Sequence, residues 1–419
     1  MREWQTVKLG SCITTKKGFA FKSSLYTSSG VPVVRVSDFT ADSISDTDLV
    51  YYPISEYDKY GEYILCEKDI LIQTVGSWQH NPNSVVGKVV RVPYYHTGSL
   101  LNQNIVKIIP NNEVDNSFIY YRLKCRDFSG FVVGEARGAA NQASITLDTI
   151  KRFELLLPCL EVQNSIATIL SRYDSLIENY QKQIKLLEEA AQRLYKEWFV
   201  DLRFPGHENT KIVDGIPEGW EKISIDDLIG KLESGSRPKG GINTSIKNGV
   251  ASVGAENVIG LGQYNFSSEK LVSYDFYNNA KKGRIENKDI LIYKDGAYIG
   301  RTSLFQDNFP HKEAMVNEHV FLLHTKKEVY QYFLFFTLYQ KVYFEKMQKL
   351  NKNAAQPGLN QNAIKSLKVL MPNENLIIRF DEIISPMMKV LFDLANQIHN
   401  LTEARDRLLP KLMCGEIEV

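Results

Sequence analysis

The feature that most constrains the fold of this chain is an internal repeat that runs through its 419 residues. Short landmarks occur twice, in the same order and at offsets of 214 to 220 residues. They are the tryptophans Trp4 and Trp220, the KDIL strings that start at Lys68 and Lys288, the alanine pairs at 139–140 and 354–355, and the prolines Pro158 and Pro372. A fixed order with a nearly constant offset indicates a duplication. The segments between the landmarks share little, so we expect two copies with one frame and different inserts.

Each copy ends in a long helical pattern. Apolar residues recur in alternating steps of four and three from Ile166 to Trp198, and the same pattern follows 214 residues later from Phe380 to Leu412. This spacing is the a/d seam of a coiled coil. A helix over 161–199 would be ~58 Å long, which is too long for the core of a small domain. The two helices are therefore predicted to pack as an antiparallel coiled coil; the alternative is two separate amphipathic helices, each buried on its own domain.

The predicted seam has two irregular positions. Arg405 stands where the repeat offset would place the counterpart of Ala191. Pro386 lies inside the second pattern, where its missing N–H and its ring should bend the helix or delay its regular part. The apolar seam residues are Ile166, Leu170, Tyr173, Ile177, Tyr180, Ile184, Leu187, Leu194, Phe380, Ile384, Leu391, Leu394, Ile398, Leu401 and Leu408.

The remaining sequence has the pattern of mixed α and β domains. Short β-branched runs are bounded by Gly, Pro, Asn and Asp, and aromatic-rich helical stretches follow them at 117–125 and 329–344. The predicted fold class is α+β, with two mixed α/β domains in tandem, separated by the two long helices and related by a pseudo-two-fold repeat. The predicted organisation is a first domain at 1–157, a central helix at 158–200, a linker at 201–217, a second domain at 218–371, a C-terminal helix at 372–413 and a tail at 414–419.

Composition excludes several classes of protein. With 43% hydrophobic and 24% charged residues, the chain is typical of soluble globular proteins. Fifty Lys and Arg against 49 Asp and Glu leave a net charge of +1, which argues against a wholly basic binder held by bulk charge. The five cysteines form no C-x-x-C pair and indicate reduced thiols, without disulfides or structural zinc. The most apolar run, Tyr330 to Tyr339, is about half the ~20 residues of a membrane span, so a cytoplasmic location is expected.

Motifs for catalysis are missing from the sequence. The chain has no P-loop, no G-x-S-x-G nucleophile turn and no N/D-P-P-Y/F loop of the kind that an adenine methyltransferase needs. His319 and His324 are five residues apart in a strand-like run, which turns them to opposite faces and disfavours a metal site. We therefore expect that the chain is not an enzyme and has no catalytic residue, metal or cofactor of its own.

The candidate functional residues are polar side chains in glycine-rich segments between the landmarks. Arg and Lys suit guanine and phosphate, and Asn and Gln suit adenine, so these side chains would let the protein read DNA. WQHN and YKDGAYIGR follow the KDIL landmark in the two copies, so corresponding faces would present different polar sets. The predicted DNA-binding residues are Lys16, Lys17, Lys22, Arg35, Gln79, His80, Asn81, Arg237, Lys239, Lys294, Tyr298 and Arg301.

The whole chain resembles the specificity subunit of type I restriction–modification enzymes. The resemblance rests on two modules that each open on a Trp and hold a KDIL strand, on the NQ-type segments that lead to LLLP and LMP, and on the heptad helices that follow. The most specific pieces are LYKEWFVDLRFPGH at 194–207 and LLPKLMCGEIEV at 408–419.

The resemblance implies a non-catalytic subunit that binds a bipartite double-stranded DNA target, with one half-site for each module and the paired helices as a ruler. Cleavage, the use of ATP and Mg, and adenine methylation from S-adenosylmethionine would belong to partner subunits, which are two methyltransferase subunits and the restriction (translocase/nuclease) subunits. No membrane partner is expected. Two alternatives remain. A single-chain restriction–methylation enzyme needs a methyltransferase motif that the sequence lacks, and a coiled-coil scaffold would bind no specific DNA.

Overall fold

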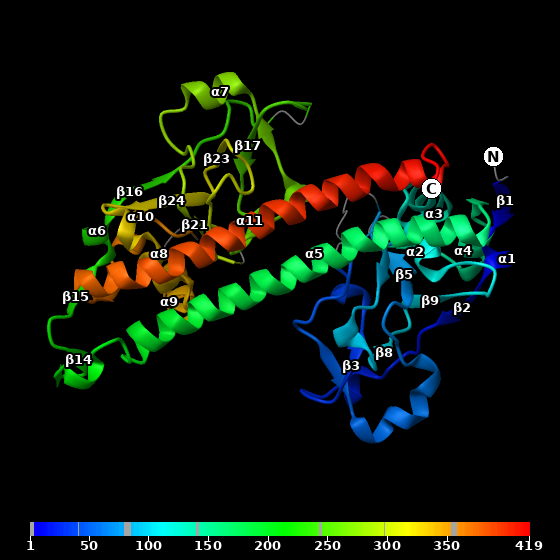
Figure 1. Cartoon of the computed structure of the whole chain (residues 1–419), viewed down its shortest axis with the longest axis horizontal. Coiled ribbons are helices and arrows are strands. Elements are labelled where there is room, and N and C mark those ends of the chain that lie inside the picture. The colour runs from blue at the N-terminus through cyan, green and yellow to red at the C-terminus, as the bar shows by residue number, and fades with distance from the viewer. Residues whose placement is uncertain are drawn as a thin grey trace. The chain divides into compact units, whose positions relative to one another are not determined.

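The chain divides into two compact units, and each contains part of both long helices. The computed structural model describes residues 4–40, 42–78, 85–139, 142–242, 245–296, 298–352 and 358–419. The first unit comprises Met1–Ser175 with Thr402–Val419, and the second comprises Leu176–Leu401. The helices α5 (Leu160–Tyr195) and α11 (Glu374–Met413) each contribute one portion to each unit (Figure 1).

The first unit is built on a four-stranded antiparallel sheet. Its strand order is β2-β9-β5-β7, with β2 at Ile13–Lys17, β9 at Ile105–Pro110, β5 at Ile70–Gln73 and β7 at Val89–Arg91. Two three-stranded sheets accompany it: β4 (Val50–Tyr52), β3 (Val31–Val34) and β8 (Leu100–Leu101) form one, and β10 (Arg137–Ala139), β11 (Gln142–Ser144) and β6 (Val75–Gly76) form the other. Its helices include α2 (Asn116–Lys124), α3 (Arg126–Glu135) and α4 (Leu147–Arg152).

The second unit repeats this plan. Its four-stranded sheet has the order β16-β24-β21-β22, with β16 at Ile229–Ser234, β24 at Val320–Thr325, β21 at Ile290–Tyr293 and β22 at Thr302–Leu304. A three-stranded sheet consists of β20 (Leu271–Val272), β17 (Val250–Val253) and β23 (Ala314–Val316), and β18 (Val258–Gly260) pairs with β19 (Gln263–Tyr264). Its helices include α7 (Tyr274–Asn279), α8 (Gln331–Tyr339), α9 (Lys341–Lys352) and α10 (Gln361–Lys365).

The repeated landmarks lie where the backbone of each unit turns or closes. In both KDIL strings the lysine has a left-handed backbone, with φ of 67° at Lys68 and 65° at Lys288. The following aspartate closes the turn by accepting a backbone hydrogen bond three residues back, at 2.8 Å for Asp69 and 2.7 Å for Asp289. The tryptophan and proline landmarks flank a strand pair in each unit, β1 (Gln5–Lys8) with β12 (Glu154–Leu157) and β15 (Glu221–Ser224) with β25 (Lys368–Met371). These repeated residues thus form the same turn and the same terminal strand pair in each unit.

The two long helices pack on each other in an antiparallel arrangement. In the second unit, the Phe380 ring of α11 lies 5.0 Å from the Phe199 ring in the one-turn π-helix Lys196–Val200 that ends α5. Further along, Leu391 and Ala395 of α11 meet Ile184 of α5 beside Gly262. Residue numbers therefore rise along α5 while they fall along α11. The predicted α+β class with two domains and packed helices is confirmed.

Helix α11 continues through Pro386 as one helix of 40 residues from Glu374 to Met413, so the proline does not delay the regular part of the helix. Pro386 is exposed, and so is Glu382, whose backbone carbonyl would have accepted the hydrogen bond that a proline cannot donate. Solvent can satisfy that carbonyl, so the helix loses one hydrogen bond without breaking.

Buried aromatic residues join the second unit's helices to its globular part. Helix α8 is buried from Gln331 to Leu338, so the most apolar run of the sequence is a core helix. Phe333 of α8 lies 5.0 Å from Phe199, and the Tyr195 hydroxyl is 2.8 Å from Thr337 Oγ1. Among the helices in the described residues, none has a stretch both long and apolar enough to cross a bilayer.

Candidate nucleic-acid interface

One edge of the four-stranded sheet in the second unit gathers polar side chains. β16 ends at Ser234, opposite Phe321, and β21 ends at Tyr293, opposite Val320, so three strands reach this edge side by side. The segments that leave or enter the strands here are 235–239, 294–296, 298–301 and 317–319, which we call the second rim. All five residues predicted for DNA contact in this half lie on it: Arg237, Lys239, Lys294, Tyr298 and Arg301.

The centre of the second rim is a chain of charged groups around His319. Arg237 forms an ion pair with Glu318, and its Nη2 lies 3.1 Å from His319 Nε2. His319 Nε2 also lies 3.2 Å from Glu318 Oε1, and the other ring nitrogen, Nδ1, is 2.9 Å from Asp295 Oδ2. Lys294 Nζ donates to the backbone carbonyl of Glu318 at 3.2 Å. The Arg237 side chain, still 52% exposed, is thus oriented by its neighbours.

An exposed aromatic residue and a second arginine lie beside this chain. The Arg301 guanidinium is 4.1 Å above the centre of the Tyr298 ring and donates to the Val258 carbonyl at 3.4 Å. Tyr298 is 56% exposed, so the pair presents an aromatic face with a positive charge next to it. Lys239 is exposed and is followed by Gly240 and Gly241, which both have positive φ in a turn.

The same edge of the first unit has a different set of side chains. β2 ends at Lys17, opposite Val106, and β5 ends at Gln73, opposite Ile105. Lys17 is exposed, whereas Lys16 forms an ion pair with Glu62 and lies 4.6 Å above the Tyr63 ring. We call the chain that leaves this edge, at 16–18 and 74–78, the first rim.

The other residues predicted in the first half lie elsewhere or outside the described residues. Lys22 is exposed and precedes a short helical turn, Ser23–Leu25. Arg35 pairs with Asp38 at 2.8 Å and donates to the Asp48 carbonyl at 3.0 Å, so its charge is already engaged within the fold. Gln79, His80 and Asn81 follow the first rim but lie outside the described residues.

In both units the chain returns to the rim at a point that follows the alanine landmark in the sequence. In the first unit, β11 follows the landmark and pairs with β6, which begins two residues after β5 ends. In the second unit, the Leu359 N–H donates to the Lys294 carbonyl at 2.9 Å. The two rims therefore lie at corresponding strand ends of the two units but have different side chains.

Sequence reasoning missed Asp295, Glu318 and His319 as members of the second rim. Asp295 directly follows Lys294, but its contact with His319 depends on the pairing of β24 with β21, which no local pattern reveals. Glu256 lies close to this group. Burial acts to raise the pKa of Glu256, but the hydrogen bonds from Lys270 and from its own backbone N–H outweigh it and lower the pKa.

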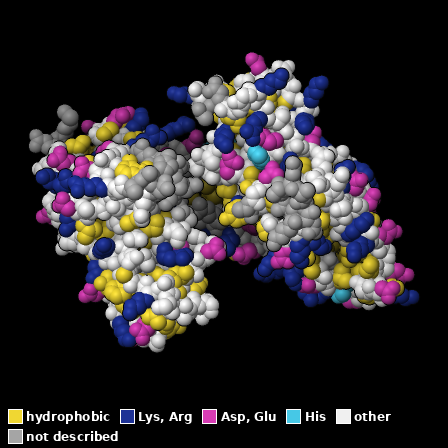
Figure 2. All heavy atoms as spheres, turned by 180° about the vertical axis from the view of Figure 1, so that it is seen from behind, with side chains coloured by type: hydrophobic (Ala, Val, Ile, Leu, Met, Phe, Trp, Pro, Cys, Tyr) yellow, Lys and Arg dark blue, Asp and Glu magenta, His cyan; other side chains and the backbone are white. Residues whose placement is uncertain are grey.

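The chemistry of the rims suits binding to nucleic acid. Within the described residues, no group of three or more His, Cys, Asp and Glu side chains could hold a metal ion. Arg, Lys and Tyr side chains are the types that contact phosphates and base edges. On the face in Figure 2, Lys and Arg side chains are interspersed with Asp and Glu side chains.

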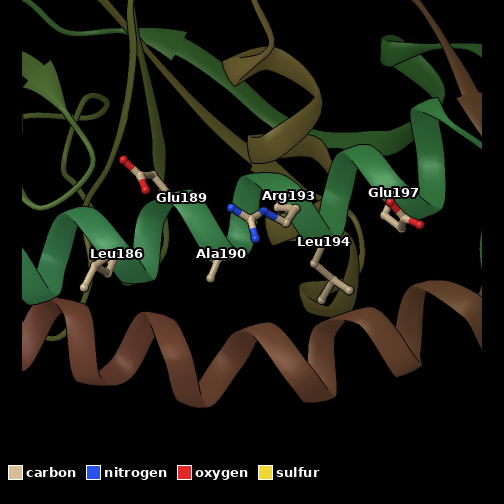
Figure 3. Close-up of a pocket in the computed structure, with 6 residues that line it drawn as sticks. All are labelled: Leu186, Glu189, Ala190, Arg193, Leu194 and Glu197. Atoms are coloured by element: carbon tan, nitrogen blue, oxygen red, sulfur yellow. The ribbon is translucent and has the colours of Figure 1, made fainter.

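A second surface feature lies on α5 within the second unit. A groove of about 460 Å³ is lined by Leu186, Glu189, Ala190, Arg193, Leu194 and Glu197. Figure 3 shows these side chains projecting from α5, except Glu197, which lies in the π-helix Lys196–Val200 that follows it. Leu186 is 64% exposed, and Ile383 and Val390 of α11 are also exposed apolar residues. Apolar side chains between two carboxylates suit a protein partner better than phosphate.

Comparison with known proteins identifies the family. The family model of the type I restriction modification DNA specificity domain matches twice, at residues 1–189 and 217–404. The MjaIX specificity subunit of Methanocaldococcus jannaschii is 28% identical over 331 residues, which is 76% of this chain and 73% of that protein. The MjaVIII specificity subunit of the same organism is 24% identical over 416 residues, which is 92% of this chain and 93% of that protein.

A solved structure has a similar fold. The S subunit of a type I restriction–modification system from M. genitalium superposes with a TM-score of 0.57 at 16% identity, covering 98% of this chain and 96% of that one. Both copies of the duplicated frame thus match one family along almost the whole sequence. The chain belongs to the DNA specificity subunits of type I restriction–modification systems, the non-catalytic members of these complexes.

Proposed function

We propose that this subunit recognises a bipartite site in double-stranded DNA and that each rim reads one half-site. The observation that carries the proposal is the duplicated rim: the same strand ends occur in both units, but the side chains there differ. Two rims with the same backbone arrangement but different polar side chains are suited to reading two different short DNA sequences. The recognition domains are proposed at 1–157 and 218–371, with spacer helices at 158–200 and 372–413.

The proposed contacts divide by chemistry. Arg237 and the stacked pair Tyr298 and Arg301 are oriented by neighbouring groups, which is what a base contact requires. Lys17 and Lys239 are exposed lysines, which suit phosphates because a phosphate contact needs charge more than a fixed direction.

The helices are proposed to set the gap between the half-sites and to bind two methyltransferase subunits. The groove on α5 and the exposed Leu186, Ile383 and Val390 support a protein-binding role for this surface. S-adenosylmethionine, ATP and Mg would be bound by the methyltransferase and restriction subunits. We also propose a cytoplasmic location, where these partners and the DNA would be available.

The proposal is tested by the methylation pattern of the assembled complex. A strain that expresses the chain with its methyltransferase subunit is expected to methylate adenine in one bipartite sequence, read by methylome sequencing. In binding assays with the purified complex, log Kd should rise with log salt by about 0.9 for each phosphate contacted. Methylation without sequence preference would contradict the proposal. Salt-insensitive behaviour without DNA binding would favour a scaffold.

The second rim should affect one half-site only. Arg301→Ala is expected to cost about 1–3 kcal/mol of binding and to relax specificity at one base pair of the second half-site. The measurement is the Kd for duplexes with each base substituted in turn, together with Tm to show that the variant is folded. Lys389→Ala removes an exposed lysine of the same unit, paired with Asp393 at 3.3 Å, and should change no Kd. Relaxed specificity in the first half-site would contradict the assignment.

A further inference from the structure

The helix seam contains one buried charge, in the first unit. Arg405 of α11 is only 10% exposed in its side chain, although it occupies a seam position that is otherwise apolar. Its Nη1 donates to Asp174 Oδ1 of α5 at 2.8 Å, and its Nη2 lies 3.1 Å from Asp42 Oδ2 and 2.8 Å from Asp406 Oδ1. A single guanidinium thus bridges α11, α5 and a loop of the globular part.

Two of the carboxylates that contact Arg405, those of Asp42 and Asp174, also accept hydrogen bonds from α2. Asp42 accepts a hydrogen bond from Lys124 Nζ at 2.6 Å, and Asp174 accepts one from the Tyr121 hydroxyl at 2.5 Å. We call Arg405, Asp42, Asp174, Asp406, Lys124 and Tyr121 the Arg405 network. Burial acts to raise the pKa of Asp42, but Lys124 and Arg405 outweigh it and hold that pKa well below its usual value. Asp42 is therefore ionised at neutral pH.

The repeat shows that the seam itself needs no charge at this position. With the offset of 214, Asp174 corresponds to Met388 and Ala191 corresponds to Arg405. Met388 and Ala191 are both fully buried in the core of the second unit. The same pair of positions is thus polar in the first unit and apolar in the second.

A buried charge restricts the helices in a way that apolar residues do not. An apolar heptad seam can shift by seven residues and still bury apolar side chains. Such a shift would move Arg405 by about 10.5 Å along the helix and leave a buried guanidinium without carboxylates. That displacement is about three base-pair rises of 3.4 Å.

We propose that Arg405 is a positioning residue that fixes the globular part of the first unit at one place on the helix pair. This inference rests on the proposed function. Arg405 would then help to determine the gap, which is the number of base pairs between the two half-sites. At the corresponding positions of the second unit, Met388 and Ala191 are instead buried in an apolar core.

The test is a gap-length profile of the full chain in complex with its methyltransferase subunits. Duplexes contain the identified half-sites with the preferred gap and with gaps one, two and three base pairs shorter or longer. The variant carries Asp174→Met and Arg405→Ala, which copies the apolar pair of the second unit. It should fold better than Arg405→Ala alone, which leaves the Asp174 carboxylate in the seam without the guanidinium, whereas Asp42 keeps its hydrogen bond from Lys124 in both variants. The control is Arg407→Ala, because Arg407 is 78% exposed and pairs with Glu403 at 3.1 Å.

The wild type and Arg407→Ala should lose about a hundredfold or more in affinity for a three-base-pair change of gap, the change that matches a shift of one heptad, and the double variant should lose at least about tenfold less than they do. Equal affinity of the double variant and the wild type for the preferred gap would show that both half-sites are still read. A double variant that unfolds cooperatively and keeps the wild-type profile would overturn the role of Arg405. A wild type that binds all gaps equally would instead overturn the ruler in the proposed function.

Discussion

Exchanging the first recognition domain for that of another specificity subunit is expected to change one half of the DNA target and leave the other half unchanged. The second rim is built only from residues of the second unit, so its side chains keep their places in the chimera. A half-site with three wrong base pairs at about 1–3 kcal/mol each should lower the affinity for the original target by about a hundredfold or more. Methylome sequencing of the chimera reads both half-sites at once.

The design of this exchange must include the end of α11. Leu412 and Met413 are buried in the core of the first unit, and Arg405 contacts Asp42 there. Exchange of 1–157 together with 402–419 should therefore give a more stable chimera than exchange of 1–157 alone, as measured by Tm. Both chimeras should have the same new half-site. A change in both half-sites would contradict the two-domain proposal.

The frame of the fold could be predicted from the sequence because it depends on local patterns. The steps of three and four from Ile166 to Trp198 require only helical geometry, and the duplication follows from repeated strings. The reason why KDIL is repeated could not be predicted. The turn at Lys288 and Asp289 depends on a left-handed backbone and a side-chain hydrogen bond, which the structure supplies.

The candidate site could be predicted only in part, because its geometry depends on strand order. Residue type and glycine-rich context were enough to select Arg237, Lys294 and Arg301. The approach of His319 to Arg237 requires β24 to lie between β16 and β21, and the sequence contains no signal for that order. Similarly, the sequence indicates only that Arg405 is an irregular seam position. Its contact with Asp42, 363 residues away, exists only in the folded chain.

Lengthening both helices by one heptad is expected to move the preferred gap by about three base pairs. Seven residues add about 10.5 Å of helix and keep the a/d seam in phase, and three base pairs of duplex rise by about the same length. Insertions after Ser175 and after Leu401 fall at the boundaries between the two units and leave their cores intact. The affinity for a duplex with the original gap should fall by more than about a hundredfold, since one half-site is lost.

The twist of DNA adds a second expectation to this experiment. Three base pairs also turn the duplex by roughly 100°, whereas a heptad leaves the seam facing the same way, so the longer chain should bind its new optimum more weakly than the original chain binds its own. A matched control inserts the same seven residues between Asp214 and Gly215, in an exposed turn with positive φ outside both helices, and should leave the preferred gap unchanged. An unchanged gap in the helix-extended chain, with both half-sites still methylated, would show that α5 and α11 do not act as the ruler.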